Sequence, residues 1–553
     1  MNRRSFVKTM TVGTLAVLCG CHVKNRFNIL IKHGMIVDGS GSDAFQSDIG
    51  IIGDKIAAIG NLNNATADTI IDGRDLVVSP GFIDIHSHTD LELLVNQHAE
   101  SKIFQGVTTE VSGNCGYSPF PFNDVDFQEE DDSAFVKYGI HIDWMNLDGF
   151  LRRLEDHKIS INYATFTGHG NLRSYVVGKN DVQATPEQMN QMKDLLRKSI
   201  EAGSFGLSTG LEYAPGSYAS TSELIELNKV VAKKNGIYAT HMRDEEDLVE
   251  EAVEEALTIC RESGVSMQIS HLKANHPHNW HKLDHLLEMI HTASESGLPV
   301  LADRYPYIAF GTGLTSFLPL WSRQGNEDEV IARFNDQRLI PQLDEHLEIQ
   351  GQNMGSWDRV VITYVFLEKN KKWIGKSISY CAGKLNQKPT QFIRSILTEE
   401  KNRVRIVGFG MNEDNLRKVL SSPLVMIASD GNAVAPHGKL GEGLPHPRYY
   451  GTFPRVLGKY CRDEKLFNLP TAVKKMTSMP AGKLGLVKRG SLTKGYFADI
   501  VVFNPETVID NATFENPHQF PTGIDYVIVN GKITVSNGHH TGALAGSVLR
   551  HQT

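Results

Sequence analysis

Apolar and polar positions alternate along both ends of the chain. Near the N-terminus the alternation breaks at Gly, Asp and Pro, as it does between β-strands. The segments are "FNILIKHGMIVDG", "SDIGIIGDKIAAIG" and "ATADTIIDGRDLVVSP", and the same texture returns in "FADIVVFNP" and "GIDYVIVNGKITVSNG" near the C-terminus. Two strand-rich segments at opposite ends can close one domain. We therefore predict a small β-sandwich domain formed by residues 26–80 and 478–550.

The middle of the chain, residues 81–477, has a different rhythm. Short apolar runs alternate with stretches of helical periodicity such as "TPEQMNQMKDLLRKSIEAG". The predicted strands are "GFIDIHSH", "TTEVSGNC", "INYATFTGH", "SFGLSTGL", "IYATHM", "SMQISHL", "VLADRYPY" and "LVMIASDG". Repeated strand–helix units give a parallel sheet, and eight units close as a (β/α)8 barrel. We predict an α/β fold with a TIM-like barrel inserted in the β domain; a doubly wound open sheet is the alternative.

A long segment separates the seventh and eighth predicted strands. It includes an insertion at about residues 308–402 with the polar run "SRQGNEDEVIARFNDQRLIPQLDEHLEIQGQNMGSWD". Strand-like pieces occur at "RVVITYVF" and "NRVRIVGFG". We expect an inserted helical subdomain or lid here. Earlier in the chain, the acidic run "EEDDSA" from Glu129 is predicted to be a solvated loop.

Residues 1–21 have the layout of an export signal. Arg3, Arg4 and Lys8 precede an apolar run that is too short to span a bilayer. "NRRSFVK" resembles a twin-arginine signal, and "LCGC" resembles a lipobox that would leave Cys21 lipidated. We expect a Tat-type or lipoprotein signal peptide and a periplasmic or cell-envelope location. A plain cleaved signal peptide is the alternative.

Composition narrows the class of partner. The chain has 553 residues, 41% hydrophobic and 22% charged, and its net charge of −8 offers no basic surface for nucleic acid. We expect a small-molecule substrate, with membrane contact only through a lipid on Cys21. The cysteines beyond the export segment lie far apart and form no C-x-x-C pair, so they do not indicate a disulfide framework.

His86 and His88 end the first predicted barrel strand, in "PGFIDIHSHTD". Side chains alternate along a strand, so both imidazoles point the same way, at the carboxyl end where barrels carry their active sites. Two such histidines are half of a metal site, although strand-end histidines also occur as ordinary polar residues. The second, fifth, sixth and eighth predicted strands also end in metal-ligand side chains: Cys115, His241, His271 and Asp430. The complete set favours a metal centre at one rim.

Taken together, these motifs resemble the amidohydrolase superfamily and, within it, the N-acyl-D-amino-acid deacylases. The superfamily pattern is H-x-H on strand one, a His on each of strands five and six, and an Asp on strand eight. The subgroup features are "SGNCGYSP", "GHGNLR", "STGLEYAPG", "ATHMRDE", "ISHLKA", "DRYPYIA", "IASDG" and "HPRYYGTFPRVLGKY". The resemblance covers nearly everything after residue 26.

The resemblance implies a zinc centre with one tightly bound ion and a position left open for water. Its protein ligands would be Cys115, His241 and His271. A second, weaker metal site, or a vestige of one, would consist of His86, His88 and Asp430. Strand four ends in "STGLEY", without the lysine that bridges two metals in many amidohydrolases. A cysteine ligand fits that difference; a buried structural cysteine is the alternative for Cys115.

Roles in the reaction also follow from the resemblance. Asp430 would be the general base that takes a proton from water and returns it to the leaving amine, while zinc activates the water and polarises the carbonyl. An ordinary structural Asp is the alternative. The carboxylate of an N-acyl amino acid calls for a cation and hydroxyl donors. The expected contacts are Lys273, Tyr213, Tyr305 and Tyr307, with a surface Lys and packing tyrosines as the alternative. Further residues either border the pocket or are structural: His169, Arg173, His437, His446 and Arg448.

The leading hypothesis is zinc-dependent hydrolysis of the amide bond of N-acyl-D-amino acids, releasing a carboxylate and a D-amino acid. Two alternatives use the same scaffold: a cyclic-amide hydrolase of the hydantoinase or dihydroorotase kind, and a dipeptidase. The missing strand-four lysine argues against both. A further alternative is a lipid-anchored binding protein with an inactive barrel, against which the complete set of ligand residues weighs.

Overall fold

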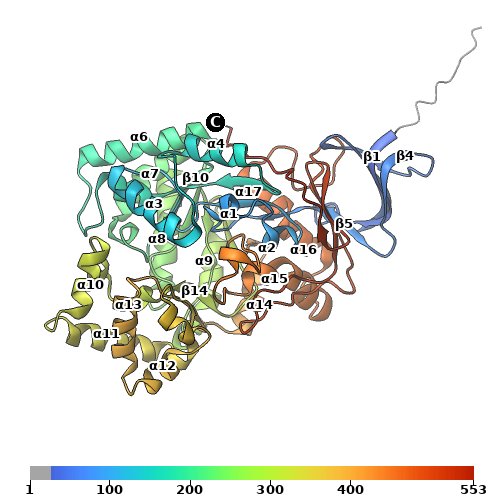
Figure 1. Cartoon of the computed structure of the whole chain (residues 1–553). Coiled ribbons are helices and arrows are strands. Elements are labelled where there is room, and N and C mark those ends of the chain that lie inside the picture. Colours follow the sequence, from blue (N-terminus) through green and yellow to red (C-terminus); the bar gives the residue numbers. More distant parts are fainter. Residues whose placement is uncertain (1–25, 553) are drawn as a thin grey trace, which may run out of the picture.

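The two ends of the chain meet in one β-sheet. The computed structural model describes residues 26–552, so the predicted export signal lies outside the described residues. The nine-stranded sheet has the order β21-β20-β19-β18-β5-β1-β2-β3, with β4 paired to β1 (Figure 1). Its strands are β1 (Arg26–Ile36), β2 (Phe45–Ile52), β3 (Lys55–Gly60), β4 (Thr66–Asp72), β5 (Val77–Pro80), β18 (Ile500–Phe503), β19 (Ile524–Val529), β20 (Lys532–Ser536) and β21 (His539–His540).

β5 joins the N-terminal strands to the C-terminal ones. Val78 on β5 pairs in parallel with Ile36 on β1 and antiparallel with Val502 on β18. Ile31 and Ile36 belong to a buried apolar cluster that also includes Ile500 and Val502. The alternating apolar side chains of the two ends thus pack into one shared core. The domain boundaries at residues 26–80 and 478–550 stay a prediction.

Parallel strands make up the centre of the chain. One sheet has the order β6-β7-β8, and another has the order β17-β13-β12-β11-β10-β9. The strands are β6 (Phe82–Asp84), β7 (Val107–Ser112), β8 (Asn162–Thr165), β9 (Thr167–Gly168), β10 (Gly206–Gly210), β11 (Ile237–His241), β12 (Ser266–Ile269), β13 (Val300–Arg304) and β17 (Val425–Ile427). Each predicted central strand overlaps an observed one, and only Phe166 separates β8 from β9. The expected α/β class is confirmed.

The last and first strands of this series come together at their carboxyl ends. Ser87, after β6, forms a parallel bridge with Gly431, after β17. The Asp430 N–H donates to the His86 carbonyl oxygen over 2.8 Å, and the His88 N–H donates to the Gly431 carbonyl oxygen over 3.2 Å. These bonds bring the H-x-H segment beside Asp430.

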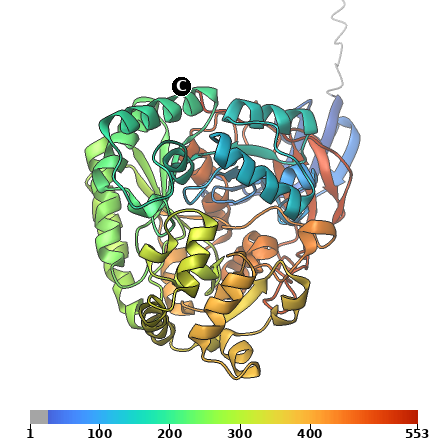
Figure 2. The same cartoon turned by 60° about the vertical axis from the view of Figure 1, so that its left-hand side comes forward.

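Helices lie between the strands in sequence and pack on them, with α7 against β10 and β11, α8 against β12, α9 against β13 and α14 against β17 (Figures 1 and 2). Apolar side chains such as Leu227, Ile259 and Leu286 fill the space between these layers. The helices of this region are α1 (Glu92–Val95), α2 (Glu100–Ile103), α4 (Leu147–His157), α5 (His169–Val176), α6 (Pro186–Ala202), α7 (Thr221–Lys233), α8 (Val249–Ser263), α9 (Leu283–Glu295) and α14 (Glu413–Ser421). None of the helices within residues 26–552 has the length and hydropathy needed to cross a bilayer.

The acidic run from Glu129 is helical, so the predicted loop is wrong there. It lies within α3 (Asp124–Tyr138), where the Asn123 side chain accepts hydrogen bonds from the N–H groups of Val125 and Asp126. This cap and the acidic first turn stabilise the helix N-terminus. Glu129 and Asp132 are exposed and Glu130 and Asp131 are partly buried, so the run has no apolar stripe that would have indicated a helix.

The predicted insertion has its own small sheet and core. Its antiparallel sheet has the order β14-β16-β15, from β14 (Phe310–Gly313), β15 (Val360–Tyr364) and β16 (Arg405–Gly408). Helices α10 (Glu327–Asn335), α11 (Ile340–Asn353), α12 (Ile378–Lys384) and α13 (Pro389–Glu399) complete it, at the lower left of Figure 1. Leu347, Trp357 and Phe392 belong to its buried apolar cluster.

Helices also lead from the last central strand back to the β-sheet. They are α15 (Arg448–Arg455), a π-helical segment (Val456–Asp463), α16 (Leu469–Met476) and α17 (Ser478–Leu484). After β21 the chain returns to the central strands, where the Leu549 N–H donates to the Tyr163 carbonyl oxygen over 2.7 Å. The C-terminal tail therefore packs beside β8.

Candidate metal centre

The side chains predicted as metal ligands converge at one edge of the parallel strands. Cys115 follows β7, His271 follows β12, and His86 follows β6. The Cys115 Sγ atom lies 3.3 Å from His86 Nε2 and 3.6 Å from His271 Nε2. Residues from three distant parts of the sequence thus form one buried cluster.

Three overlapping groups in this cluster have ligand atoms within 4.8 Å of one another. They are His86, Cys115 and His271; His86, His88 and Asp430; and His241, Glu245 and His271. The second is the trio predicted for the weaker site. The predicted tight trio does not appear as a group of its own, because His241 is grouped with Glu245 and His271 rather than with the sulfur. The His241 and His271 rings are nevertheless adjacent, with centroids 4.6 Å apart.

Several of these residues have backbone conformations that L-amino acids rarely adopt. The φ angles are +51° at Cys115, +35° at His271 and +50° at Asp430. Gly116, beside Cys115, has a φ of +78°, and a Cβ there would lie 2.6 Å from the Gly210 nitrogen. Such strain persists only where the surroundings fix it, and it concentrates at functional sites.

The donor set fits a borderline divalent cation. Both ring nitrogens of buried His241 have no hydrogen-bond partner among the described residues. The Glu212 carboxylate approaches His241 Nε2 to 3.1 Å without forming a hydrogen bond. Buried polar atoms are normally satisfied, so these orphaned atoms are free to act as ligands. Imidazole, thiolate and carboxylate together suit zinc.

Electrostatics favour an ionised sulfur. Burial opposes ionisation, but the positive charges of His86 and His88 and the neighbouring imidazoles outweigh it and hold the pKa of the Cys115 thiol well below its usual value. A thiolate is the form that binds a metal.

Two carboxylates that the sequence analysis missed orient the imidazoles. Both oxygens of Asp303 lie 3.2 Å from His86 Nδ1, and Asp303 Oδ1 accepts the His271 N–H over 2.9 Å. His86 therefore turns Nε2 towards the sulfur. Glu245 Oε1 lies 2.9 Å from His271 Nδ1. Carboxylates behind ligating histidines commonly fix the ring orientation in this way. The only signal in the sequence was their position in "DRYPYIA" and "ATHMRDE".

Asp430 sits between imidazoles and a guanidinium. Its Oδ1 lies 3.0 Å from His88 Nε2 and 3.6 Å from His86 Nε2, and its Oδ2 lies 2.9 Å from Arg448 Nη1. Burial raises the pKa of the Asp430 carboxyl, but Arg448 and His86 outweigh that effect and hold the pKa well below its usual value. Asp430 is therefore a carboxylate at neutral pH and available as a base.

The predicted substrate contacts divide into two groups. Lys273 Nζ contacts the Glu245 carboxylate and lies 2.9 Å from His271 Nδ1. The Tyr213 ring lies 4.8 Å from the His241 ring, and the Tyr305 ring lies 4.6 Å from the Arg448 guanidinium. Tyr307 instead donates its hydroxyl to Asp510 Oδ2 over 3.2 Å, away from the cluster. Its contacts favour the packing alternative.

The sequence left open whether five further residues border the pocket or are structural, and their contacts now distinguish them. Arg448 is buried, and its Nε and Nη1 atoms form no hydrogen bond within the described chain. His169 and Arg173 both bind Glu223, over 2.9 Å and 3.0 Å, in a buried structural network. Two histidines lie apart from the metal cluster: His446 hydrogen bonds to the Ala309 carbonyl oxygen, and His437, largely exposed, pairs with Glu100. Of these residues, only Arg448 touches Asp430 with a free donor.

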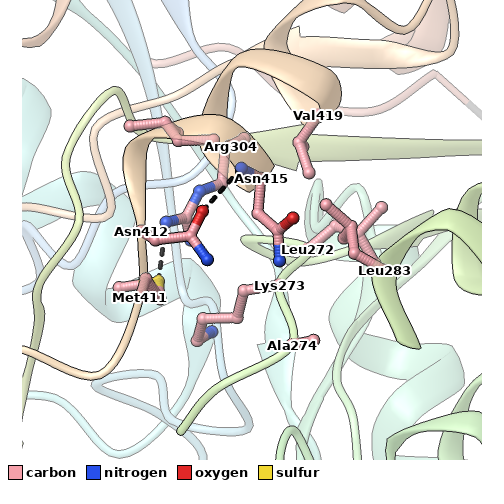
Figure 3. A pocket seen from close by; sticks show the side chains of 10 residues that line it. Leu272, Lys273, Ala274, Leu283, Arg304, Met411, Asn412, Asn415 and Val419 are labelled. Carbon is pink, nitrogen blue, oxygen red and sulfur yellow. Dashed lines mark hydrogen bonds between the residues drawn. The ribbon is translucent and has the colours of Figure 1, made fainter. Parts of the chain in front are cut away.

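A small cavity lies behind the cluster. Figure 3 shows Lys273 and Arg304 on its wall, with Arg304 Nη2 donating to Met411 Sδ over 2.8 Å. Its volume of about 10 Å³ holds roughly one water molecule. The cavity is too small for an N-acyl amino acid, but Arg304 also donates to the His271 carbonyl oxygen over 3.3 Å and so supports that strained residue.

Comparison with known proteins places this arrangement in a family. A model described as "Amidohydrolase family" matches residues 69–340 and 413–535. The D-aminoacylase of Alcaligenes xylosoxydans xylosoxydans is 36% identical over 530 residues, 95% of this chain and 97% of that protein. The N-acyl-D-glutamate deacylase of the same organism is 33% identical over 92% of this chain and 94% of its own length.

Solved structures give the same result. A Bordetella bronchiseptica N-acyl-D-glutamate deacylase, complexed with zinc and a phosphonate inhibitor, has a TM-score of 0.79 at 32% identity and covers 95% of this chain and 100% of its own. A D-aminoacylase whose binuclear metal centre shows "one-metal activation and second-metal attenuation" also has a TM-score of 0.79, at 34% identity over 95% of this chain and 100% of its own. These neighbours fit an amidohydrolase TIM-barrel fold.

More distant structures share the fold alone. An Arthrobacter aurescens L-hydantoinase has a TM-score of 0.54 at 16% identity, over 95% of this chain and 100% of its own. This distance gives the cyclic-amide alternative little support. The chain belongs to the amidohydrolase family and, within it, to the N-acyl-D-amino-acid deacylases.

Proposed function

We propose that this protein hydrolyses the amide bond of N-acyl-D-amino acids in a zinc-dependent reaction, releasing a carboxylate and a D-amino acid. The observation that carries the proposal is the convergence of Cys115, His86, His271 and Asp430 in one buried cluster. D-aminoacylase, which is 36% identical over 95% of this chain, supports the substrate class.

The thiolate cluster supplies the metal ligands. Cys115 and His271 would hold the tightly bound zinc together with His241, whose ring nitrogens are free of hydrogen bonds. His86, His88 and Asp430 would form the weaker second site. When bound, zinc activates a water molecule and polarises the amide carbonyl. Asp303 and Glu245 keep the ligand imidazoles in the required orientation.

Asp430 moves the proton. Its carboxylate, kept ionised by Arg448, takes a proton from the attacking water and then delivers it to the leaving amide nitrogen. Arg448 and His88 fix the two carboxylate oxygens, so the base is oriented before substrate arrives. No serine or cysteine nucleophile is required.

Cationic and hydroxyl donors beside the cluster would bind the substrate carboxylate. Arg448 offers unpaired N–H groups, and Lys273 lies next to His271. Tyr213 and Tyr305 border the same space and complete the proposed contact set. Charged hydrogen bonds of this kind give both affinity and orientation.

The finer architecture and the location are also proposals. The bridge between Ser87 and Gly431 supports closure of the parallel strands into a barrel. The layout of the first 21 residues supports export to the periplasm or cell envelope, with a lipid on Cys21 as the only membrane contact.

A substrate panel tests the proposed function. Purified, zinc-loaded protein is assayed with paired N-acetyl-D- and N-acetyl-L-amino acids, a hydantoin, dihydroorotate and isoaspartyl dipeptides. We expect turnover of the D-configured N-acyl compounds. Turnover of only the cyclic compounds or the dipeptides would replace the proposal with one of the alternatives, and no turnover with added zinc would favour an inactive barrel.

A further inference from the structure

Lys102 is a charged side chain with no contact to solvent. It lies on α2, and its side chain and that of its partner Asp84 are both fully buried. The ammonium group donates to Asp84 Oδ2 over 2.7 Å, to Ser429 Oγ over 2.7 Å and to the Gly431 carbonyl oxygen over 2.8 Å. All three of its N–H donors are therefore used.

Asp84, Lys102 and Ser429, which we call the Lys102 cluster, hold the chain on both sides of Asp430. Asp84 Oδ1 accepts the Ser429 N–H over 2.9 Å, and Asp84 Oδ2 accepts the Ser429 hydroxyl over 2.5 Å. Ser429 Oγ in turn accepts the Gly431 N–H over 3.0 Å. The residues before and after Asp430 are thus bound to the same buried group.

The segment that is held in this way is strained. Asp430 has a φ of +50°, in the left-handed region. A non-glycine residue keeps such a conformation only when its neighbours fix it. The segment of His86 to His88 holds one side of this turn, since the Asp430 N–H donates to the His86 carbonyl oxygen and the Gly431 carbonyl oxygen accepts from the His88 N–H and the Ser87 hydroxyl. The Lys102 cluster holds the other side, through the Ser429 N–H and both backbone groups of Gly431.

We propose that Lys102 is a positioning residue that, with Asp84 and Ser429, fixes the strained turn presenting the Asp430 carboxylate to the substrate. The inference rests on the proposed function. A buried ion pair is weak grounds for stability, because removing two charges from water offsets much of their attraction. A role in holding the base explains why a fully buried lysine ends on the backbone of that turn.

Ser429→Ala is the main test variant. It removes the hydroxyl that links Lys102, Asp84 and Gly431 but leaves the Lys102–Asp84 pair intact, so the chain avoids an unpaired buried charge. Lys102→Met is the second variant. Arg489→Met is the matched control, because Arg489 forms another buried ion pair, with Asp499, far along the chain from Asp430.

Turnover of an N-acetyl-D-amino acid, zinc content and melting temperature are measured for each variant. We expect Ser429→Ala to lower kcat by about 10²-fold, as a small misplacement of a catalytic group does, with KM and zinc content unchanged. Arg489→Met should lower the melting temperature and leave kcat unchanged below it. An unchanged kcat in Ser429→Ala, or an equal loss in Arg489→Met, would overturn the inference.

A crystal structure of Ser429→Ala separates this inference from the proposed function. We expect the Asp430 carboxylate to move away from Arg448 and His88. If the turn keeps the φ of Asp430 and its contacts in this variant, the inference is overturned, whatever the activity of the wild-type protein. If the wild-type protein turns over no N-acyl-D-amino acid, only the proposed function is removed.

Discussion

Arg448 Nη1 lies 2.9 Å from Asp430 Oδ2, and both side chains are buried. Apart from this approach, Arg448 Nη1 and Nε form no hydrogen bond in the described chain. The guanidinium therefore pairs with Asp430 and still has N–H groups available for another ligand. This pair links the proposed base to the proposed site of carboxylate binding.

Replacing this guanidinium should change the pH dependence of turnover. Burial raises the pKa of Asp430 and Arg448 lowers it, so Arg448→Met should raise that pKa. The ionised base is then lost at a higher pH as the solution is acidified, and the acid limb of the kcat profile should move upward. Arg417→Met, at a surface ion pair, is the control. An acid limb at the wild-type position would show that Arg448 does not set the charge of Asp430.

The carboxylate itself can be removed without changing its size. Asp430→Asn should lower kcat by about 10²- to 10⁴-fold, the usual contribution of a general base. The tightly bound zinc should remain, since the proposed ligands of that site are Cys115, His241 and His271. Activity is measured together with zinc content by mass spectrometry. Retained activity would remove Asp430 from the mechanism.

The sulfur can be tested separately from the other cysteines. Cys115→Ala should lose most of the bound zinc and the activity with it, because one of three protein ligands is gone. Cys381→Ala is the matched control, since Cys381 is a fully buried free cysteine in the inserted region. Its zinc content should equal that of the wild type. Equal zinc in both variants would make Cys115 a structural cysteine.

Glu110 should make stability depend on pH. Burial raises the pKa of its carboxyl from 4.5 to about 7, and its Oε1 atom has no partner in the described chain. The folded state therefore binds more protons than the unfolded state between these values, so stability falls as pH rises through this window.

The Glu110→Gln variant should escape this loss. Relative to wild type, its free energy of unfolding should be larger (the variant more stable) at pH 8 than at pH 5, by an amount on the order of 3 kcal/mol. Denaturant titrations at both pH values measure it, with the exposed Glu251→Gln as control. A difference that is the same at both pH values would mean that Glu110 ionises normally.

The sequence predicted the parallel strands and the residues at their ends because both follow local rules. His86 and His88 share a face through the period of a strand, and parallel strands bring their carboxyl ends to one edge. Each predicted central strand overlaps an observed strand for that reason. The cysteine and histidine cluster followed from the same geometry.

Contacts between side chains that are distant in the sequence could not be predicted from local patterns. Asp303 is one charged residue near the end of β13, and only the fold shows that it faces His86 Nδ1. Tyr307 has the same alternation signal as Tyr305, yet it turns to Asp510. The burial of Lys102 could not be predicted either, because its partners Ser429 and Gly431 are more than 300 positions away in sequence. The helix α3 was missed since its acidic run has no apolar pattern of helical period, although Asn123 caps its first turn.

The central claim is that remote residues converge on one zinc ion with the Cys115 thiolate among its ligands. Zinc X-ray absorption spectroscopy on the purified protein tests this most directly. We predict one sulfur scatterer at about 2.3 Å and nitrogen or oxygen scatterers at about 2.0–2.1 Å, with the sulfur shell lost in Cys115→Ala. A wild-type zinc spectrum fitted by nitrogen and oxygen alone would contradict the account.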